Sequence, residues 1–160
     1  MNKALIAASA AAVALVAAPA MAQEAQSYGN LGYSVVEIDD ASEYGAIHGR
    51  VGARYDHVGG EVEAGFGVDS DDASDLDASV AAYATGWFDI GENFSLLGRL
   101  GAGYTWYSAP GFEESEFSFN YGVGAQYTFG DNGIRADYTR WDFRETEAAD
   151  VFSLSYVRKF

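Results

Sequence analysis

The stretch Phe117–Phe129, FSFNYGVGAQYTF, alternates between two kinds of side chain without a break. One parity is aromatic or aliphatic, and the other carries only Ser, Asn, Gly, Gln and Thr. Because successive side chains of a strand point to opposite faces, the pattern predicts one apolar and one small, polar face. Thirteen residues are enough for a tilted strand to cross a bilayer, which takes about 9–11 residues. Aromatic residues at both ends, with Val123 and Ala125 between them, are typical of a strand that meets two membrane–water interfaces.

The N-terminal segment has the features of a cleaved export signal. Lys3 gives a positive start, residues 4–18 are apolar and Ala-rich, and Ala20–Ala22 matches the small-x-small cleavage pattern. We therefore predict a signal peptide over residues 1–22 and a single mature domain over residues 23–160. A transmembrane helix is the alternative, but it needs about 20 apolar residues and this run is shorter.

Composition narrows the class of protein. The chain has no cysteine, so an exported form needs another means of holding itself together, such as a closed ladder of backbone hydrogen bonds. Its formal net charge of −15 argues against nucleic acid as a partner, because phosphate binding needs a basic surface. An aromatic content of 15% and an apolar content of 49% are too high for a disordered chain.

Seven further segments show strand patterns with turn signals between them. We expect strands at about 30–38, 45–56, 61–69, 78–88, 94–106 and 117–129, a seventh that begins at Ile134, and a last one that begins at Phe152. The connections 57–60, 89–93 and 130–133 are short, whereas 39–44, 69–77, 108–116 and 145–150 are longer and hold more than half of the 24 acidic residues. Transmembrane barrels have short periplasmic turns and longer outer loops. An even number of strands then places both termini in the periplasm.

The first hairpin shows how parity and charge together predict a register. A short turn at residues 57–60 brings the polar faces of the second and third strands into line. The cross-strand pairs that follow are Asp56–Glu61, Arg54–Glu63 and His48–Asp69. Because a slip by one residue would turn every side chain to the other face, agreement of register and face supports the pairing.

For three strands the pattern does not settle which residues face inward. The strand at 30–38 is the least regular, and for 78–88 we prefer Tyr83, Thr85 and Trp87 inward. In the seventh strand the outward parity meets Arg140 and Asp142. Either that strand has left the hydrocarbon there, or a bulge near Arg140 reverses the parity.

With this architecture the chain resembles the small outer-membrane β-barrel family of Gram-negative bacteria, of the OmpA, OmpX and opacity-protein kind. The matching segments are Phe94-Ser95-Leu96 after an Asn turn, Leu100-Gly101-Ala102-Gly103-Tyr104, and the terminal Phe160. The resemblance implies an all-β fold: an eight-stranded antiparallel up-and-down transmembrane β-barrel in the outer membrane. It also implies a C-terminal signal for the barrel-assembly machinery, carried by Phe152, Leu154, Tyr156 and Phe160.

Arg158 departs from the family's C-terminal pattern, which has an apolar or aromatic residue at that position. An arginine stem can lie along apolar surface while its head reaches phosphate groups, so the departure is compatible with a membrane strand. The main rival fold is a soluble eight-stranded barrel of the lipocalin kind. That fold would have to bury the phenylalanines and tyrosines and expose Gly, Ser and Thr.

Inward-facing charges are the main candidates for a functional site. They are Arg50, Arg54, Glu61, Glu63, Arg99, Arg135 and Asp137. An eight-stranded barrel is just wide enough for its side chains to fill it, and charges inside it must pair because an unpaired buried ion is costly. We therefore expect a packed polar network that does not conduct. The alternative is a narrow porin-like pore for ions or very small solutes.

The acidic loop at residues 69–77 invites a calcium interpretation but fails the EF-hand pattern, since Ser74 and Val80 stand where glycine and glutamate are needed. Candidates for loose divalent binding are Asp69, Asp71, Asp72 and Asp75, and the simpler interpretation is a solvated acidic loop. His48 with an acid and a serine such as Ser70 would begin a hydrolase site, but no other part of that site is recognisable. We expect no enzyme activity and no cofactor.

The function implied by the family is structural or surface interaction, such as membrane integrity or adhesion; a fold alone does not fix it. The expected partners are outer-membrane lipid and lipopolysaccharide, the barrel-assembly machinery and an unidentified extracellular partner. We expect a monomer in the outer membrane.

Overall fold

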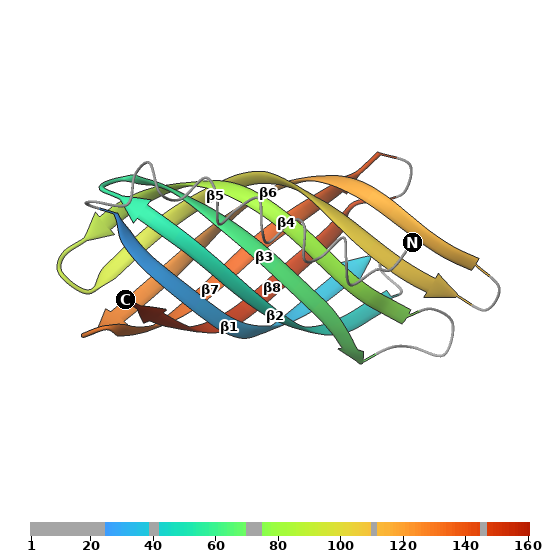
Figure 1. The fold of residues 1–160 in the computed structure, drawn as a ribbon, viewed down its shortest axis with the longest axis horizontal. Coiled ribbons are helices and arrows are strands. Elements are labelled where there is room, and N and C mark those ends of the chain that lie inside the picture. Colours follow the sequence, from blue (N-terminus) through green and yellow to red (C-terminus); the bar gives the residue numbers. More distant parts are fainter. Residues whose placement is uncertain (1–24, 39–41, 70–74, 110–111, 145–146) are drawn as a thin grey trace.

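The computed structural model describes residues 25–38, 42–69, 75–109, 112–144 and 147–160. Over these ranges the chain forms antiparallel strands that close into one barrel in sequence order (Figure 1). The strands are β1 (Gln26–Ile38), β2 (Ser42–Tyr55), β3 (Val58–Asp69), β4 (Asp75–Ile90), β5 (Phe94–Ala109), β6 (Phe112–Phe129), β7 (Asn132–Phe143) and β8 (Ala149–Lys159). The predicted eight-stranded up-and-down barrel is confirmed. Within the same ranges, no helix is both long and apolar enough to cross a membrane.

The barrel has two ends, which we name the turn rim and the loop rim. Figure 1 shows the last residues of β2, β4 and β6 at one end, together with the C-terminus, and those of β1, β3, β5 and β7 at the opposite end. The strands run further toward the loop rim than the sequence predicted, since β5 reaches Ala109 and β6 begins at Phe112 where a loop over 108–116 was expected. The predicted signal peptide lies outside the described residues.

The predicted register of the first hairpin is wrong by four positions. Arg54 lies opposite Gly59, and His48 lies opposite Gly65 rather than Asp69. The cause is a tight turn in which Asp56 itself has a positive φ of 51°, a conformation that aspartate tolerates better than most residues. Because an error of four is even, the two faces of each strand are unaffected.

The predicted division into outward and inward faces is confirmed along the strands. Leu31, Val123 and Leu154 are about 60% exposed on the outer surface, at 64%, 61% and 60%. In β4 the preferred facing is correct, since Tyr83, Thr85 and Trp87 are buried inside. The outward phenylalanines and tyrosines rule out the lipocalin arrangement.

The seventh strand has no bulge that reverses its parity. Its register with β6 runs without interruption from Asn132 to Phe143, and Trp141 and Phe143 point inward and are buried. Arg140 therefore lies on the outer face, where its side chain is 40% exposed. Of the two alternatives for this strand, the bulge is wrong.

The interior is layered, whereas the sequence led us to expect a polar core throughout. An apolar cluster near the loop rim, the loop-side cluster, consists of Val36, Tyr44, Ala46, Trp141, Phe143, Ala149 and Val151. A smaller turn-side cluster consists of Tyr28, Trp87, Leu97 and Val157. Polar side chains occupy the space between them.

Candidate functional site

Six buried charges meet in the middle of the barrel and form what we call the ionic cluster. Its members are Arg50 from β2, Glu61 and Glu63 from β3, Arg99 from β5, and Arg135 and Asp137 from β7. Each is at most 6% exposed. Three cations and three carboxylates cancel in charge, which is the arrangement that makes burial of such groups tolerable.

Arg50 connects β3 to β7 across the interior of the barrel. It is the cross-strand partner of Glu63, to which its Nε donates a hydrogen bond. Its second guanidinium nitrogen lies 2.6 Å from an Asp137 carboxylate oxygen, and its third donates to Ser153 Oγ at 3.1 Å. One arginine of β2 therefore ties its neighbour β3 to β7 and β8, which are far from both in the sequence.

Arg135 makes the complementary connection from β7 back to β3. It donates two hydrogen bonds to Glu61, and its Nε lies 2.8 Å from Asp137. Glu61 also accepts a hydrogen bond of 2.6 Å from the Tyr28 hydroxyl. This fork-like pairing of guanidinium and carboxylate is stronger and more directional than a single contact.

Arg99 completes the cluster from β5. One of its nitrogens lies 3.2 Å from Glu63 and 3.7 Å from Glu61, so it bridges the two acids. Its guanidinium stacks on the Tyr83 ring at 3.5 Å from the ring centre. The stacked aromatic face compensates in part for the water that the cation has lost.

The small face of β6 makes room for these side chains. A Cβ added to Gly124 would lie 2.5 Å from an Asp137 oxygen and 3.1 Å from Leu97, so only glycine fits there. The alternation of Phe117–Phe129 thus has a second consequence: its outward parity contacts the surroundings, and its inward parity leaves space for charges from β2, β3 and β7.

Arg54 does not belong to the ionic cluster, although the sequence grouped it there. It lies at the turn rim, where it donates to both carboxylate oxygens of Asp89, at 3.1 and 2.5 Å. Ser95 donates to the same carboxylate, and Arg54 lies 4.9 Å from the centre of the Trp87 ring. Asp89 falls in a predicted turn, and no local pattern indicated that it would pair with Arg54.

Sequence reasoning also missed the aromatic partners of the cluster. Tyr28 lies before the predicted start of the first strand, so its face was not assigned. Tyr83 was placed inward, but nothing in the local pattern indicated that it would meet Arg99. Both contacts join strands that are distant in sequence, and only the closed barrel defines them.

His48 is buried and lies opposite Gly65 rather than beside Asp69. Its Nδ1 lies 2.7 Å from Ser34 Oγ, and the residue is 3% exposed. The proposed serine, Ser70, lies outside the described residues. So do Asp71 and Asp72, and the structure describes only the backbone of Asp69 and Asp75. In the described part of the chain, no group of three or more His, Cys, Asp or Glu side chains is placed to hold a metal ion.

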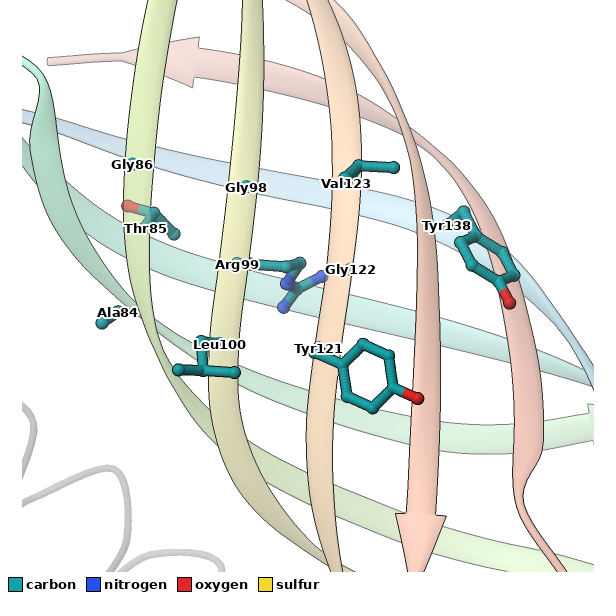
Figure 2. Close-up of a pocket in the computed structure, with 10 residues that line it drawn as sticks. All are labelled: Ala84, Thr85, Gly86, Gly98, Arg99, Leu100, Tyr121, Gly122, Val123 and Tyr138. Atoms are coloured by element: carbon teal, nitrogen blue, oxygen red, sulfur yellow. The ribbon is translucent and has the colours of Figure 1, made fainter.

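The outer surface of the described part of the barrel has grooves, two of which are large enough to hold part of a ligand. Figure 2 shows the first, of about 590 Å³, where Gly86 of β4 and Gly98 of β5 are cross-strand partners. A Cβ added at either glycine would have no heavy atom within 4 Å, so the missing side chains make the hollow. Tyr121 and Tyr138 are on the next two strands. The second groove, of about 500 Å³, crosses β1, β2 and β3 and ends at β8.

A family model described as the outer membrane protein beta-barrel domain matches residues 8–160. The chain therefore belongs to this family of outer-membrane β-barrel proteins, which implies the outer membrane of a Gram-negative bacterium. A search of curated proteins finds no match.

Solved structures with the same fold come from several bacteria. Ail, the attachment invasion locus protein of Yersinia pestis, is 23% identical, with a TM-score of 0.62 over 86% of this chain and 100% of that one. The N-terminal β-barrel domain of Pseudomonas aeruginosa OprF is 15% identical, with a TM-score of 0.68 over 86% of this chain and 98% of that one. Neisserial surface protein A is 14% identical, with a TM-score of 0.61 over the same shares. At these identities the likeness establishes the fold alone.

Proposed function

We propose that this protein is a closed, non-conducting barrel of the outer membrane whose role is structural and in surface interaction. The observation that carries the proposal is the layered interior. The charges of the ionic cluster are paired with one another, and an apolar cluster lies on each side of them along the barrel axis. An ion crossing the barrel would have to separate buried ion pairs and pass two apolar layers, and both steps are costly.

The loop rim supports the surface-interaction part of the proposal. Pairing between β5 and β6 extends to Ala109 and Phe112, whereas pairing between β6 and β7 begins only at Ser118 and Phe143. The β5–β6 pair thus extends beyond the end of β7, and β6 has a strand edge there that is not paired with β7. Edges of this kind are templates for binding another extended chain.

The charge of the chain indicates what kind of partner suits that rim. Ail has been solved in complex with the heparin analogue sucrose octasulfate, a polyanion. The present chain has a formal net charge of −15, and three of its glutamates fall within residues 112–117. We propose that its extracellular partner is basic or uncharged rather than a sulfated polysaccharide.

The orientation and processing of the chain are part of the same proposal. The turn rim, with the C-terminal Phe160, faces the periplasm, as short turns do in this class of barrel. A signal peptide over residues 1–22 is removed, lipopolysaccharide surrounds the loop-rim half, and the barrel is a monomer. Phe152, Leu154, Tyr156 and Phe160, which all face outward, form the signal for the barrel-assembly machinery.

We also propose that the protein is not an enzyme. One of the similar structures is the outer membrane enzyme PagL, at 14% identity, so the fold itself does not decide the matter. In the described part of this chain, His48 is enclosed in the barrel and His57 lies at the turn rim beside Asp56. His48→Ala should leave the lipid A of the host cell unchanged by mass spectrometry.

Conductance in planar bilayers tests the proposal directly. The purified barrel should give little or no steady current. The alternative is a narrow pore, and it is favoured by buried polar atoms without a protein partner, such as His48 Nε2 and Arg99 Nε, because such atoms commonly bind internal water. Large, reproducible channels would contradict the proposal and support the pore.

A further inference from the structure

The second outer groove differs from the first in having charged groups at one end. Its floor is formed by outward positions of β1, β2 and β3: Gly29, Leu31, Gly49, Val51, Val62 and Ala64. Leu31 is the cross-strand partner of Gly49, and Val51 is the partner of Gly29, so the two glycines lie diagonally on neighbouring strands. A Cβ added to Gly49 would meet a single atom within 4 Å, at 3.9 Å, whereas one added to Gly29 would lie 3.3 Å from the Phe160 ring. The hollow is therefore open over Gly49 and is bounded by that ring at Gly29.

The groove ends at the turn rim beside Arg158 of β8. One nitrogen of this arginine donates to Asn132 Oδ1 at 2.8 Å, and another lies 3.8 Å from the Asp131 carboxylate. The side chains remain accessible, at 50% exposed for Arg158 and 74% for Asp131. The apolar hollow thus leads to a cation and an anion that are side by side and both reachable from outside.

We propose that this groove binds one phospholipid with a phosphoethanolamine headgroup. An acyl chain fills the hollow over Gly49 and contacts the Phe160 ring, the Arg158 guanidinium holds the phosphate, and Asp131 holds the ammonium. A guanidinium has several donors in a planar fork that matches phosphate oxygens, and Asn132 uses only one of them. A zwitterionic headgroup complements the arginine–aspartate pair, whereas a purely anionic one would place its charge beside Asp131.

The surroundings of the groove are consistent with this ligand. Membership of the outer-membrane barrel family places the outward apolar face against lipid chains. The assignment to the periplasmic leaflet, which is built of phospholipid, rests on the orientation proposed above. Binding to the isolated protein does not depend on that orientation, so the two proposals can fail separately.

The first groove provides an internal comparison because the charges near it are joined by close hydrogen bonds. Arg140 donates to both oxygens of Asp150, at 2.9 and 3.1 Å, and the Tyr138 hydroxyl donates to the same carboxylate at 2.7 Å. Asp150 thus accepts hydrogen bonds from two side chains, whereas Asp131 meets Arg158 only at 3.8 Å, beyond hydrogen-bond distance. A chain can lie in the first groove, but its headgroup has no comparable pair of ligands.

Native mass spectrometry of the detergent-solubilised protein, titrated with phosphatidylethanolamine or phosphatidylglycerol, tests the inference. The wild type should retain one phosphatidylethanolamine and prefer it over phosphatidylglycerol. Gly49→Leu should abolish this retention by filling the hollow, and the matched variant Gly98→Leu, which fills the first groove, should keep it. Arg158→Gln should weaken binding about tenfold, as expected for loss of one charge-assisted hydrogen bond.

Asp131→Asn separates the headgroup from the acyl chain. It should reduce or reverse the preference for phosphatidylethanolamine while one lipid is still retained. Heat-dependent gel mobility verifies that each variant is folded, and Arg158→Gln and Asp131→Asn alter exposed positions that do not pack in the core. Equal retention by the Gly49 and Gly98 variants, or equal binding of the two lipids by the wild type, would overturn the proposal.

Discussion

The ionic cluster and the Arg54–Asp89 pair use the same chemistry in two different places. Both join arginine to carboxylate across strands, but the side chains of the cluster are at most 8% exposed, whereas those of Arg54 and Asp89 are 19% and 42% exposed. Water can replace a partner lost at the rim, but it cannot do so freely in the centre. Burial, rather than the number of hydrogen bonds, therefore decides how much the barrel depends on each pair.

The largest effect is expected from Arg135→Met. This change removes the cation from Glu61 and Asp137 and leaves two buried carboxylates short of a partner. We expect a loss of about 3–5 kcal/mol in the free energy of unfolding, measured by urea titration of the heat-modifiable gel shift.

The double variant Glu61→Leu, Arg135→Met is the control for that experiment. It removes one cation and one carboxylate of the ionic cluster. The loss in free energy of unfolding should therefore be clearly smaller than that of Arg135→Met alone. A double variant less stable than the single one would mean that the cluster acts through packing rather than charge balance.

Trp141→Ala tests the loop-side cluster, which closes the interior beyond the charges. Trp141 is 5% exposed and its ring packs edge-on against Phe143 at 6.2 Å between ring centres. Removal should cost about 3 kcal/mol and open a cavity. If the loop-side cluster also blocks conduction, bilayer recordings should show brief, small currents in this variant and none in the wild type. If neither protein conducts, the ionic cluster is sufficient to block ions without Trp141.

Gly124→Val should destabilise the barrel by about 1–3 kcal/mol, because the new side chain enters space occupied by Asp137 and Leu97. Gly98→Val makes the same chemical change on the outward face, where nothing lies within 4 Å. It should be close to neutral. Equal losses in the two variants would point to backbone flexibility rather than to the crowded interior.

The smallest effect is expected at the turn rim. Asp89→Asn weakens the pair with Arg54, but both groups are partly exposed and Trp87 still lies under the guanidinium. The loss should be about 0–1 kcal/mol and should shrink further in high salt. A loss in free energy of unfolding as large as that of Arg135→Met would mean that burial does not set the strength of these pairs.

Much of the barrel follows from local pattern. The period of two in Phe117–Phe129 indicates which residues face outward, and the same rule places Arg50, Glu61 and Arg135 inward on strands that were predicted independently. Turn residues give the number of strands but not their lengths, since β5 and β6 continue through a stretch that is too polar to resemble a membrane strand. Backbone pairing stabilises a strand whether or not its side chains face lipid.

Local sequence pattern is enough to assign the alternation of faces and, through it, the membrane barrel. Which charges meet depends on the closed barrel. Arg50 rather than Arg54 lies opposite Glu63, and Arg54 lies instead against Asp89 of the next hairpin. The physical reason is that facing depends only on odd or even position, whereas register depends on the turn at Asp56 and on closure of the barrel. The outward facing of the aromatic residues in Phe117–Phe129 could thus be assigned from that segment by itself. The need for glycine at position 124 is explained only by the Asp137 side chain, which occupies the space beside it.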